Sequence, residues 1–101
     1  MPEFSNPFTF LNNDRKLTHE ELVRAIRFVI AAEYEAIQFY QQTAESTNDK
    51  LSQEVLIGIA NEEKEHVGEF LRLLRELDPE EEKFYQEGYK EVEEIIKELK
   101  K

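Results

Sequence analysis

The chain has no cysteine and only one methionine among its 101 residues. Without cysteine it forms no disulfide, offers no thiolate to a metal and has no cysteine nucleophile. No apolar run approaches the roughly 18 residues of a membrane-spanning helix. The N-terminus also lacks the basic and apolar segments of a signal peptide. From these absences we expect a soluble intracellular protein.

Basic residues are scarce as well. The chain has 13 lysines and arginines and 23 acidic residues, so its formal net charge is −10. Nucleic-acid binding needs a basic footprint, and an anionic membrane surface repels a chain of this sign, so we expect neither partner. Dispersed acidic charge often contributes only solubility, but it can also attract cations. A domain this short buries a small share of its surface, so it could need a partner to complete its core.

Residues 1–17 show no helical period and hold two of the three prolines. We expect an irregular N-terminal arm, which either frays or docks through its apolar side chains. These side chains are Phe4, Phe8, Phe10 and Leu11. Residues 18–101 are expected to form one helical domain.

A capping box is predicted to start the helical domain, because Thr18 precedes Glu21 by three residues. Apolar residues then recur at steps of three and four, the period of a helix that packs along a seam. The seam residues are Leu22, Ile26, Val29, Glu33, Ala36 and Tyr40. The following run STNDK (46–50) carries turn chemistry.

A second seam with the same period follows the turn and consists of Leu56, Ile59, Glu63, His66, Phe70, Leu73 and Leu77. Asp78 is a predicted N-cap, and Pro79 is the predicted first residue of a third helix. The third helix carries Tyr85, Tyr89, Val92, Ile96 and Leu99. We expect it to pack on the outside or to mediate assembly. The short turn predicts an antiparallel hairpin for the first two helices, so the expected fold is all-α.

Polar residues interrupt both seams at one level of this hairpin. Glu33 lies about 15 residues before the centre of the turn, and Glu63 and His66 lie about 15 and 17 residues after it. Buried carboxylates need compensation, and no lysine or arginine falls on either seam near this level. Internal salt bridges or polar residues that fix the register are one explanation. A bound metal cation is the simpler one.

The spacing supports a metal site. Glu63 and His66 stand at i and i+3, so they share a helix face. Ferritin-like di-iron bundles combine two such Glu-x-x-His motifs with two single glutamates from four helices. This chain supplies half of that set, so a homodimer would complete both the four-helix bundle and a two-metal site. Carboxylate and imidazole suit iron, manganese or zinc, and open positions on iron would admit O₂.

The segments AAEYEAIQFY (31–40) and NEEKEH (61–66) resemble the encapsulated ferritins, the ferritin-like cargo of encapsulin nanocompartments. The resemblance covers about residues 20–77, and the arm and acidic third helix are similar to archaeal, Pyrococcus-type members. It implies a dimeric four-helix bundle, a ring-shaped decamer, and a di-iron ferroxidase that feeds mineral storage. It also implies a cytoplasmic location inside the nanocompartment lumen. The implied partner is the encapsulin shell protein, which some members carry in the same chain.

The resemblance also implies roles for single residues. Glu33, Glu63 and His66 take the places of the iron ligands. Tyr40 takes the place of a tyrosine beside the centre, where it either tunes the centre or serves as a core aromatic. Glu35 matches an acidic residue that attracts incoming metal, but Ala32 stands where a second acid is usual.

Two other functions stay open at this point. A rubrerythrin-like peroxidase would usually bring a cysteine-rich electron-transfer module, and the chain has no cysteine. A non-catalytic helical assembly module would use the polar seam residues only to set pairing. That module predicts an unchanged metal content when Glu63 or His66 is replaced by alanine.

Overall fold

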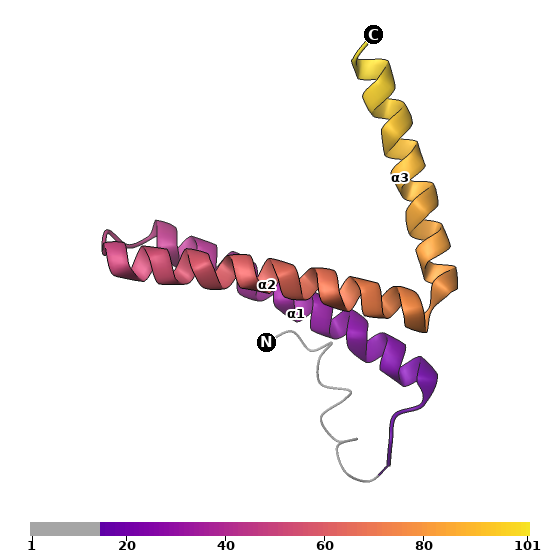
Figure 1. Cartoon of the computed structure of the whole chain (residues 1–101), viewed down its shortest axis with the longest axis horizontal. Helices are drawn as coiled ribbons and strands as arrows, with labels where there is room; N and C mark the ends of the chain where they lie inside the picture. The colour runs from indigo at the N-terminus through magenta and orange to yellow at the C-terminus, as the bar shows by residue number, and fades with distance from the viewer. Residues whose placement is uncertain (1–14) are drawn as a thin grey trace.

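The computed structural model describes residues 15–101, which form three α-helices and no strand. The helices are α1 (His19–Glu45), α2 (Lys50–Leu77) and α3 (Pro79–Leu99). α1 and α2 lie side by side as an antiparallel hairpin, and α3 turns away from it (Figure 1). The expected all-α fold, a two-helix hairpin followed by a C-terminal helix, is confirmed. The expected arm over residues 1–17 lies mostly outside the described residues.

The N-terminus of α1 carries the predicted capping box. The hydroxyl of Thr18 accepts a hydrogen bond from the backbone N–H of Glu21 at 3.2 Å. The Glu21 carboxylate in turn accepts one from the backbone N–H of Thr18 at 2.9 Å. Arg15 donates two further hydrogen bonds to this carboxylate, at 2.7 and 2.8 Å. Arg15, followed by the Thr18 N–H, lowers the pKa of Glu21 to about 2.

Side-chain caps also define the starts of α2 and α3. The Asp49 carboxylate accepts a hydrogen bond from the backbone N–H of Ser52 at 3.0 Å. Asp78 accepts one from the backbone N–H of Glu81 at 3.2 Å, and Pro79 is the first residue of α3. Proline suits this position because the missing N–H would have no partner inside the helix. The predicted turn and the predicted start of the third helix are therefore confirmed.

The interior of the hairpin is a narrow apolar strip between α1 and α2. Its buried side chains are Val23, Ile26, Ile30, Ile37 and Ala44 from α1, and Ala60, Val67 and Leu74 from α2. Leu74 is the most enclosed large side chain, with 2% of its surface exposed. Such a strip removes apolar surface from water at roughly 25 cal/mol per Å², which makes it the main source of hairpin stability.

The predicted seams are wrong by one residue over much of their length. Leu22, Val29 and Ala36 are only half-buried, Ile59 and Leu73 are exposed, and the residue after each of them is buried instead. Both rows are apolar, and neighbouring helix positions differ by only about 100°. Periodicity alone therefore does not decide which row faces the other helix. We call the displaced set Leu22, Val29, Ala36, Ile59 and Leu73 the flank row.

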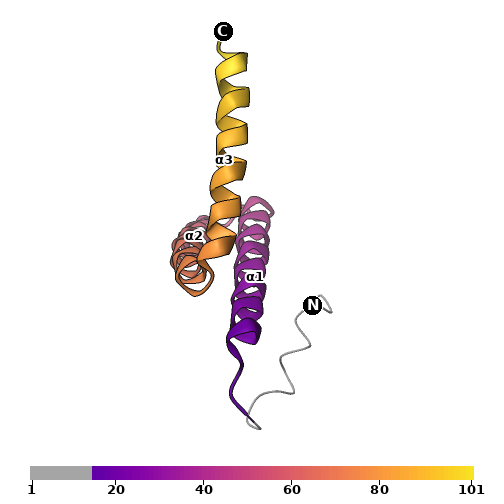
Figure 2. The same cartoon turned by 90° about the vertical axis from the view of Figure 1, so that its right-hand side faces the viewer.

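Polar contacts at the base of α3 join it to the hairpin. Arg27 on α1 forms an ion pair with Glu81 and lies 3.7 Å from the Asp78 carboxylate. The ring Nε2 of His19 lies 2.8 Å from the carbonyl oxygen of Leu77, which links the start of α1 to the end of α2. Beyond these contacts α3 projects from the hairpin, as the end-on view in Figure 2 shows.

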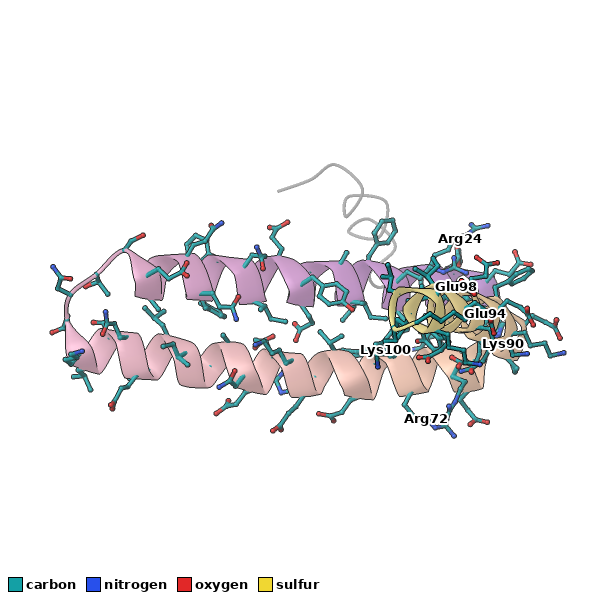
Figure 3. The ribbon with its side chains drawn as sticks, turned by 90° about the horizontal axis from the view of Figure 1, so that it is seen from above. Arg24, Arg72, Lys90, Glu94, Glu98 and Lys100 are labelled. Carbon is teal, nitrogen blue, oxygen red and sulfur yellow. The ribbon has the colours of Figure 1, made fainter. Side chains whose placement is uncertain are left out.

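α3 keeps much of its apolar surface in contact with solvent. Phe84 is 75% exposed, Tyr89 60% and Leu99 80%. In the view from above, α3 is seen nearly end-on over the right-hand end of the hairpin, and Arg24 and Arg72 point outward from opposite edges of the hairpin (Figure 3). Of the two expected placements, packing of α3 on the outside of the hairpin is therefore not observed, and a role in assembly stays a prediction. Among the described residues, no helix has the length and apolar content to span a membrane.

Replacing Leu74 by alanine tests the hairpin core. Because this side chain is almost completely enclosed, we expect Leu74→Ala to lower the free energy of unfolding by about 2–5 kcal/mol. Urea unfolding followed by far-ultraviolet circular dichroism measures this loss. Leu51→Ala is the matched control, since Leu51 is 73% exposed, and it should cost less than about 0.5 kcal/mol. Equal losses in the two variants would contradict the observed core.

The capping carboxylate predicts a specific pH dependence. The folded pKa of Glu21, about 2, lies below its ordinary value of 4.5, so the Arg15 pairing stabilises the fold above pH 4.5. The contribution is lost as the pH falls toward 2. Glu21→Gln keeps a hydrogen-bonding side chain but removes the charge. The melting temperature of wild type should exceed that of Glu21→Gln above pH 4.5, and the difference should shrink toward pH 2. A difference that does not change with pH would contradict the pairing.

Candidate metal centre

Three candidate metal ligands meet between α1 and α2. Glu33 comes from α1, and Glu63 and His66 come from α2. One ligand atom of each residue lies within 4.8 Å of the other two. His66 Nδ1 is 3.3 Å from Glu33 Oε2 and 3.7 Å from Glu63 Oε1. The sequence predicted these residues at one level of the hairpin, and the structure brings them together there.

Both carboxylates are largely withdrawn from water without a lysine or arginine partner. The side chains of Glu33 and Glu63 are only 20% and 18% exposed. Over residues 15–101, the ion pairs of these two side chains involve only His66. Glu33 Oε2 is buried, and its one charged partner over residues 15–101 is the His66 imidazole, whose Nδ1 lies 3.3 Å away in a geometry that makes no hydrogen bond. An unsatisfied buried acceptor costs about 1–3 kcal/mol, and a bound cation would remove that cost.

The closeness of the two carboxyl groups appears in the pKa values of the site. Hydrogen bonding with the neighbouring Glu63 carboxyl is the main cause that raises the pKa of Glu33. Burial is the second cause and repulsion by the Glu63 charge the third, and His66 opposes all three. For His66, desolvation lowers the pKa, but the charges of Glu63, Glu33 and Glu69 together outweigh it. The net pKa of His66 is raised, so the imidazole acts as the local counter-charge. A divalent cation would serve the same purpose more strongly.

A groove of about 500 Å³ leads from solvent to the site. Glu33, His66 and Glu69 form its polar lining, and Phe70 and Leu73 form its apolar lining. The His66 side chain is 49% exposed. An ion can therefore reach the imidazole and the Glu33 carboxylate without opening the hairpin.

The flank row continues the surface around this groove. On α2, Ile59 and Leu73 lie seven residues before and after His66, so all three share one side of the helix. Their side chains are 36% and 41% exposed, respectively. An apolar row of this kind is typical of a surface that another helix covers. The candidate ligands thus open onto a face that a single chain leaves uncovered.

Tyr40 and Glu35, the other predicted site residues, lie outside the three-residue cluster. Tyr40 is half-buried two turns beyond Glu33, and its ring packs edge-on against Phe39 with a centroid distance of 6.2 Å. Glu35 is exposed and follows Glu33 by two residues, so it lies on a different face of α1. Neither Glu35 nor Ala32 lines the groove. The structure therefore brings three of the five predicted residues together.

The sequence pattern did not identify one acidic residue that lines the groove. Glu69 stands three residues after His66, on the same side of α2, and is exposed at the groove. The signal was present as a repeated three-residue step from Glu63 to His66 to Glu69. It was not recognised because glutamate is abundant on every face of this acidic chain.

The donor set defines what the arrangement can bind. Two carboxylates and one imidazole suit iron, manganese or zinc. Three donors from one chain leave coordination positions open for water, O₂ or ligands from another chain. The combination of a single glutamate with a Glu-x-x-His motif corresponds to half of a di-iron carboxylate site.

Comparison with known proteins gives two curated relatives. The ferritin-like–encapsulin shell fusion protein of Pyrococcus furiosus is 43% identical over 90 residues, which is 89% of this chain and 26% of that protein. The encapsulin nanocompartment cargo protein EncC of Myxococcus xanthus is 40% identical over 80 residues, which is 79% of this chain and 60% of that protein. The chain thus spans less than two thirds of the length of either relative.

A solved structure and a family model cover most of the same region. The crystal structure of the encapsulated ferritin domain from Pyrococcus furiosus is 43% identical to this chain and superposes with a TM-score of 0.79. The alignment covers 85% of this chain and 88% of that domain. The fold is therefore a ferritin-like helical fold. Because the family model also matches residues 10–94, the chain belongs to the EncFtn-like family.

Proposed function

We propose that this chain is a ferroxidase, which oxidises Fe²⁺ to Fe³⁺ with O₂ at a two-iron centre shared by two copies of the chain. The ligands are Glu33, Glu63 and His66 of each copy. The observation that carries this proposal is the pair of largely buried carboxylates without a lysine or arginine partner. The buried Glu33 Oε2, which accepts no hydrogen bond from residues 15–101, adds to it.

The dimer follows from the number of ligands and from the exposed surface. One chain supplies two glutamates and one histidine, which is half of the set that holds two metal ions in di-iron bundles. Two copies supply four carboxylates, whose charge balances two divalent ions. The exposed Ile59 and Leu73 beside His66 would be covered in the same contact. Two hairpins together make a four-helix bundle, so a single contact completes the site and the core.

Fe²⁺ is the substrate at such a centre, and the protein groups bind and orient it. Each Fe²⁺ loses one electron, so one filled centre supplies two electrons. Four Fe²⁺, from two fillings of the centre, together with four protons convert one O₂ into two water molecules. Carboxylates favour the product because their negative charge stabilises Fe³⁺ more than Fe²⁺. His66 must lose its proton before it binds metal, so binding releases protons. Tyr40, two turns along α1, is proposed to tune the centre rather than to bind the ion.

The wider setting is proposed from the relatives. One of them is named as a fusion with an encapsulin shell and the other as an encapsulin cargo protein. We therefore assign this chain to the lumen of an encapsulin nanocompartment in the cytoplasm, where it supplies Fe³⁺ for mineral storage. A ring-shaped decamer of five dimers is the proposed assembly. α3, with its exposed apolar side chains, is available for contacts between dimers.

Aerobic oxidation of Fe²⁺ by the purified protein tests the ferroxidase. A fast phase of oxidation should saturate at about one Fe²⁺ per chain, because two chains share two ions. Glu63→Ala removes one carboxylate of the site and should abolish this phase.

Glu62→Ala is the matched control for Glu63→Ala. Glu62 is the adjacent residue of α2 and is exposed, so the variant should keep the fast phase. A wild-type rate no higher than that of buffer, or equal losses in both variants, would exclude the proposed centre.

Metal and assembly should be linked, because ligands from two chains join the same pair of ions. Fe²⁺ is then expected to shift the protein toward the larger oligomer by mass action. Size-exclusion chromatography in chelator and in excess Fe²⁺ under anaerobic conditions measures the shift. His66→Ala should lose it. Identical elution of wild type in both buffers would contradict a site at the interface.

A further inference from the structure

The sequence of α3 repeats with a period of seven residues along its whole length. It divides into the heptads EEEKFYQ (80–86), EGYKEVE (87–93) and EIIKELK (94–100). Each heptad has glutamate first and lysine fourth, and its third and sixth residues are apolar or tyrosine, except for Glu82. A strict period of seven is slightly shorter than two turns of a straight α-helix, and it is typical of a helix that supercoils with another helix.

The glutamates and lysines of the repeat form the outer face of α3. In each heptad the lysine Nζ lies near the carboxylate of the glutamate three residues before it. The pairs are Lys83 with Glu80 at 3.0 Å, Lys90 with Glu87 at 3.6 Å, and Lys97 with Glu94 at 3.7 Å. All six side chains are 69–75% exposed. Exposed pairs of this kind add little to stability, so the outer face is suited to solvent rather than to a partner.

The third and sixth residues of the heptads form an apolar face that the chain itself leaves open. These residues are Tyr85, Tyr89, Val92, Ile96 and Leu99. Tyr89 is 60% exposed, Val92 54% and Leu99 80%. α3 meets the hairpin at its base, and from there this face runs outward into solvent (Figure 1). A face of this length and period is typical of a helix that another helix covers.

The helix that fits this face best is α3 of a second copy. In the hairpin, the strip between α1 and α2 is already buried, and the flank row beside His66 is assigned to the proposed two-chain site. Among the helices of residues 15–101, α3 is the one without a buried side chain. A two-fold axis would cover the apolar faces of two such helices with one contact.

The order of large and small side chains favours an antiparallel pair. With the two repeats aligned end to end, Tyr85 lies opposite Ile96 of the second copy, and Tyr89 lies opposite Val92 of the second copy. Each tyrosine then faces a smaller aliphatic side chain, which allows the two rows to interdigitate. A parallel pair would instead place Tyr85 opposite Tyr85 and Tyr89 opposite Tyr89.

A glycine and the charges of the helix ends agree with the same direction. Gly88 has no atom within 4 Å of the place where a Cβ would stand. In the antiparallel pair it lies opposite Ile95 of the second copy, a side chain that is 57% exposed in the single chain. The acidic start of α3 (80–82) then lies beside the basic end (100–101) of the second copy. The same gradient of charge also stabilises the single helix, so it supports the direction without carrying the proposal.

We propose that α3 pairs with α3 of a second copy as a two-stranded antiparallel coiled coil. This contact is a second two-fold interface, separate from the contact at the metal site, and it does not require metal. It deepens the proposed function by naming what α3 contacts in the proposed ring. A chain with two different two-fold contacts alternates them, and such a series closes into a ring with an even number of chains. A ring of five dimers meets this condition.

The mass of the full-length protein in chelator tests the pair. Size-exclusion chromatography with light scattering should give the mass of two chains for wild type. Val92→Glu places a charge in the middle of the apolar face and should weaken the pair at least about tenfold, which shifts the mass toward one chain. Lys90→Glu is the matched control, because it changes the charge even more but lies on the outer face, where Lys90 is 74% exposed. It should keep the mass of two chains, and circular dichroism should show equal helix content in both variants.

Single-cysteine variants report the direction, because the natural chain has no cysteine. Tyr85→Cys and Ile96→Cys, mixed in reduced form in chelator and oxidised with diamide, should form a disulfide with each other. Neither variant should cross-link with itself, because antiparallel pairing separates the two copies of either position by about 16 Å along the axis. A disulfide cannot span that distance. A parallel pair would cross-link each variant with itself.

Anaerobic Fe²⁺ separates this contact from the metal centre. Wild type should form the larger oligomer, whereas Val92→Glu should gain mass only up to two chains. Val92→Glu should also keep the fast phase of aerobic Fe²⁺ oxidation, since its metal ligands are unchanged. His66→Ala should keep the mass of two chains with and without Fe²⁺.

Three results would overturn the proposed pair: wild type with the mass of one chain in chelator, an unchanged mass in Val92→Glu, or self-cross-linking of Ile96→Cys. A different result would remove the metal centre alone. In that case wild type would keep the mass of two chains in chelator but would show neither the fast phase nor any gain of mass with Fe²⁺.

Discussion

The centre of the hairpin depends on one constraint: two carboxylates are held between two helices and, over residues 15–101, have no lysine or arginine partner. Glu33 and Glu63 are mostly withdrawn from water, and hydrogen bonding between their carboxyl groups, together with burial, raises the pKa of Glu33. The protonated imidazole of His66 offsets only part of this charge, because it is itself half exposed and its proton is not permanent. Two shielded carboxylates placed this close together lower the stability of the hairpin unless a cation offsets their charge. Their presence is therefore better explained by cation binding than by a contribution to hairpin stability.

The same arrangement explains why the surface around the site stays open. The strip that holds α1 to α2 uses one apolar row on each helix, with Leu74 at its most enclosed point. The flank row lies beside it and has no covering element among the described residues, since α3 leaves the hairpin at its base (Figures 1 and 2). A second copy would therefore satisfy the ligand count and the exposed apolar surface with one contact.

Local chemistry made much of the fold predictable. The starts of α1 and α3 were identified from Thr18, Glu21 and Asp78 because a capping side chain bonds to backbone groups within a few residues, whatever the rest of the chain does. The meeting of Glu33 with Glu63 and His66 was predictable for a related reason. A short turn fixes the register of an antiparallel hairpin, so distance from the turn predicts height.

The sequence did not show which of two neighbouring apolar rows on each helix is buried against the other helix. Val29 and the residue after it are both good core side chains, and only packing against the other helix decides which of them is enclosed. The position of Glu69 at the groove was missed for a different reason. Its residue type is too common here to be informative, and only the shape of the groove separates it from its neighbours.

The one-residue displacement of the buried rows also bears on how the centre can work. If the predicted seam had been the buried one, His66 would face the interior of the hairpin and would be sealed from solvent together with both carboxylates. Because Val67 takes that interior position instead, His66 is turned to the flank, where half of it is exposed. Glu33 and Glu63 stay between the helices, so the cluster has a shielded side with the charge and an open side with the imidazole. That asymmetry leaves the imidazole accessible from outside the hairpin, whereas both carboxylates are shielded between its helices.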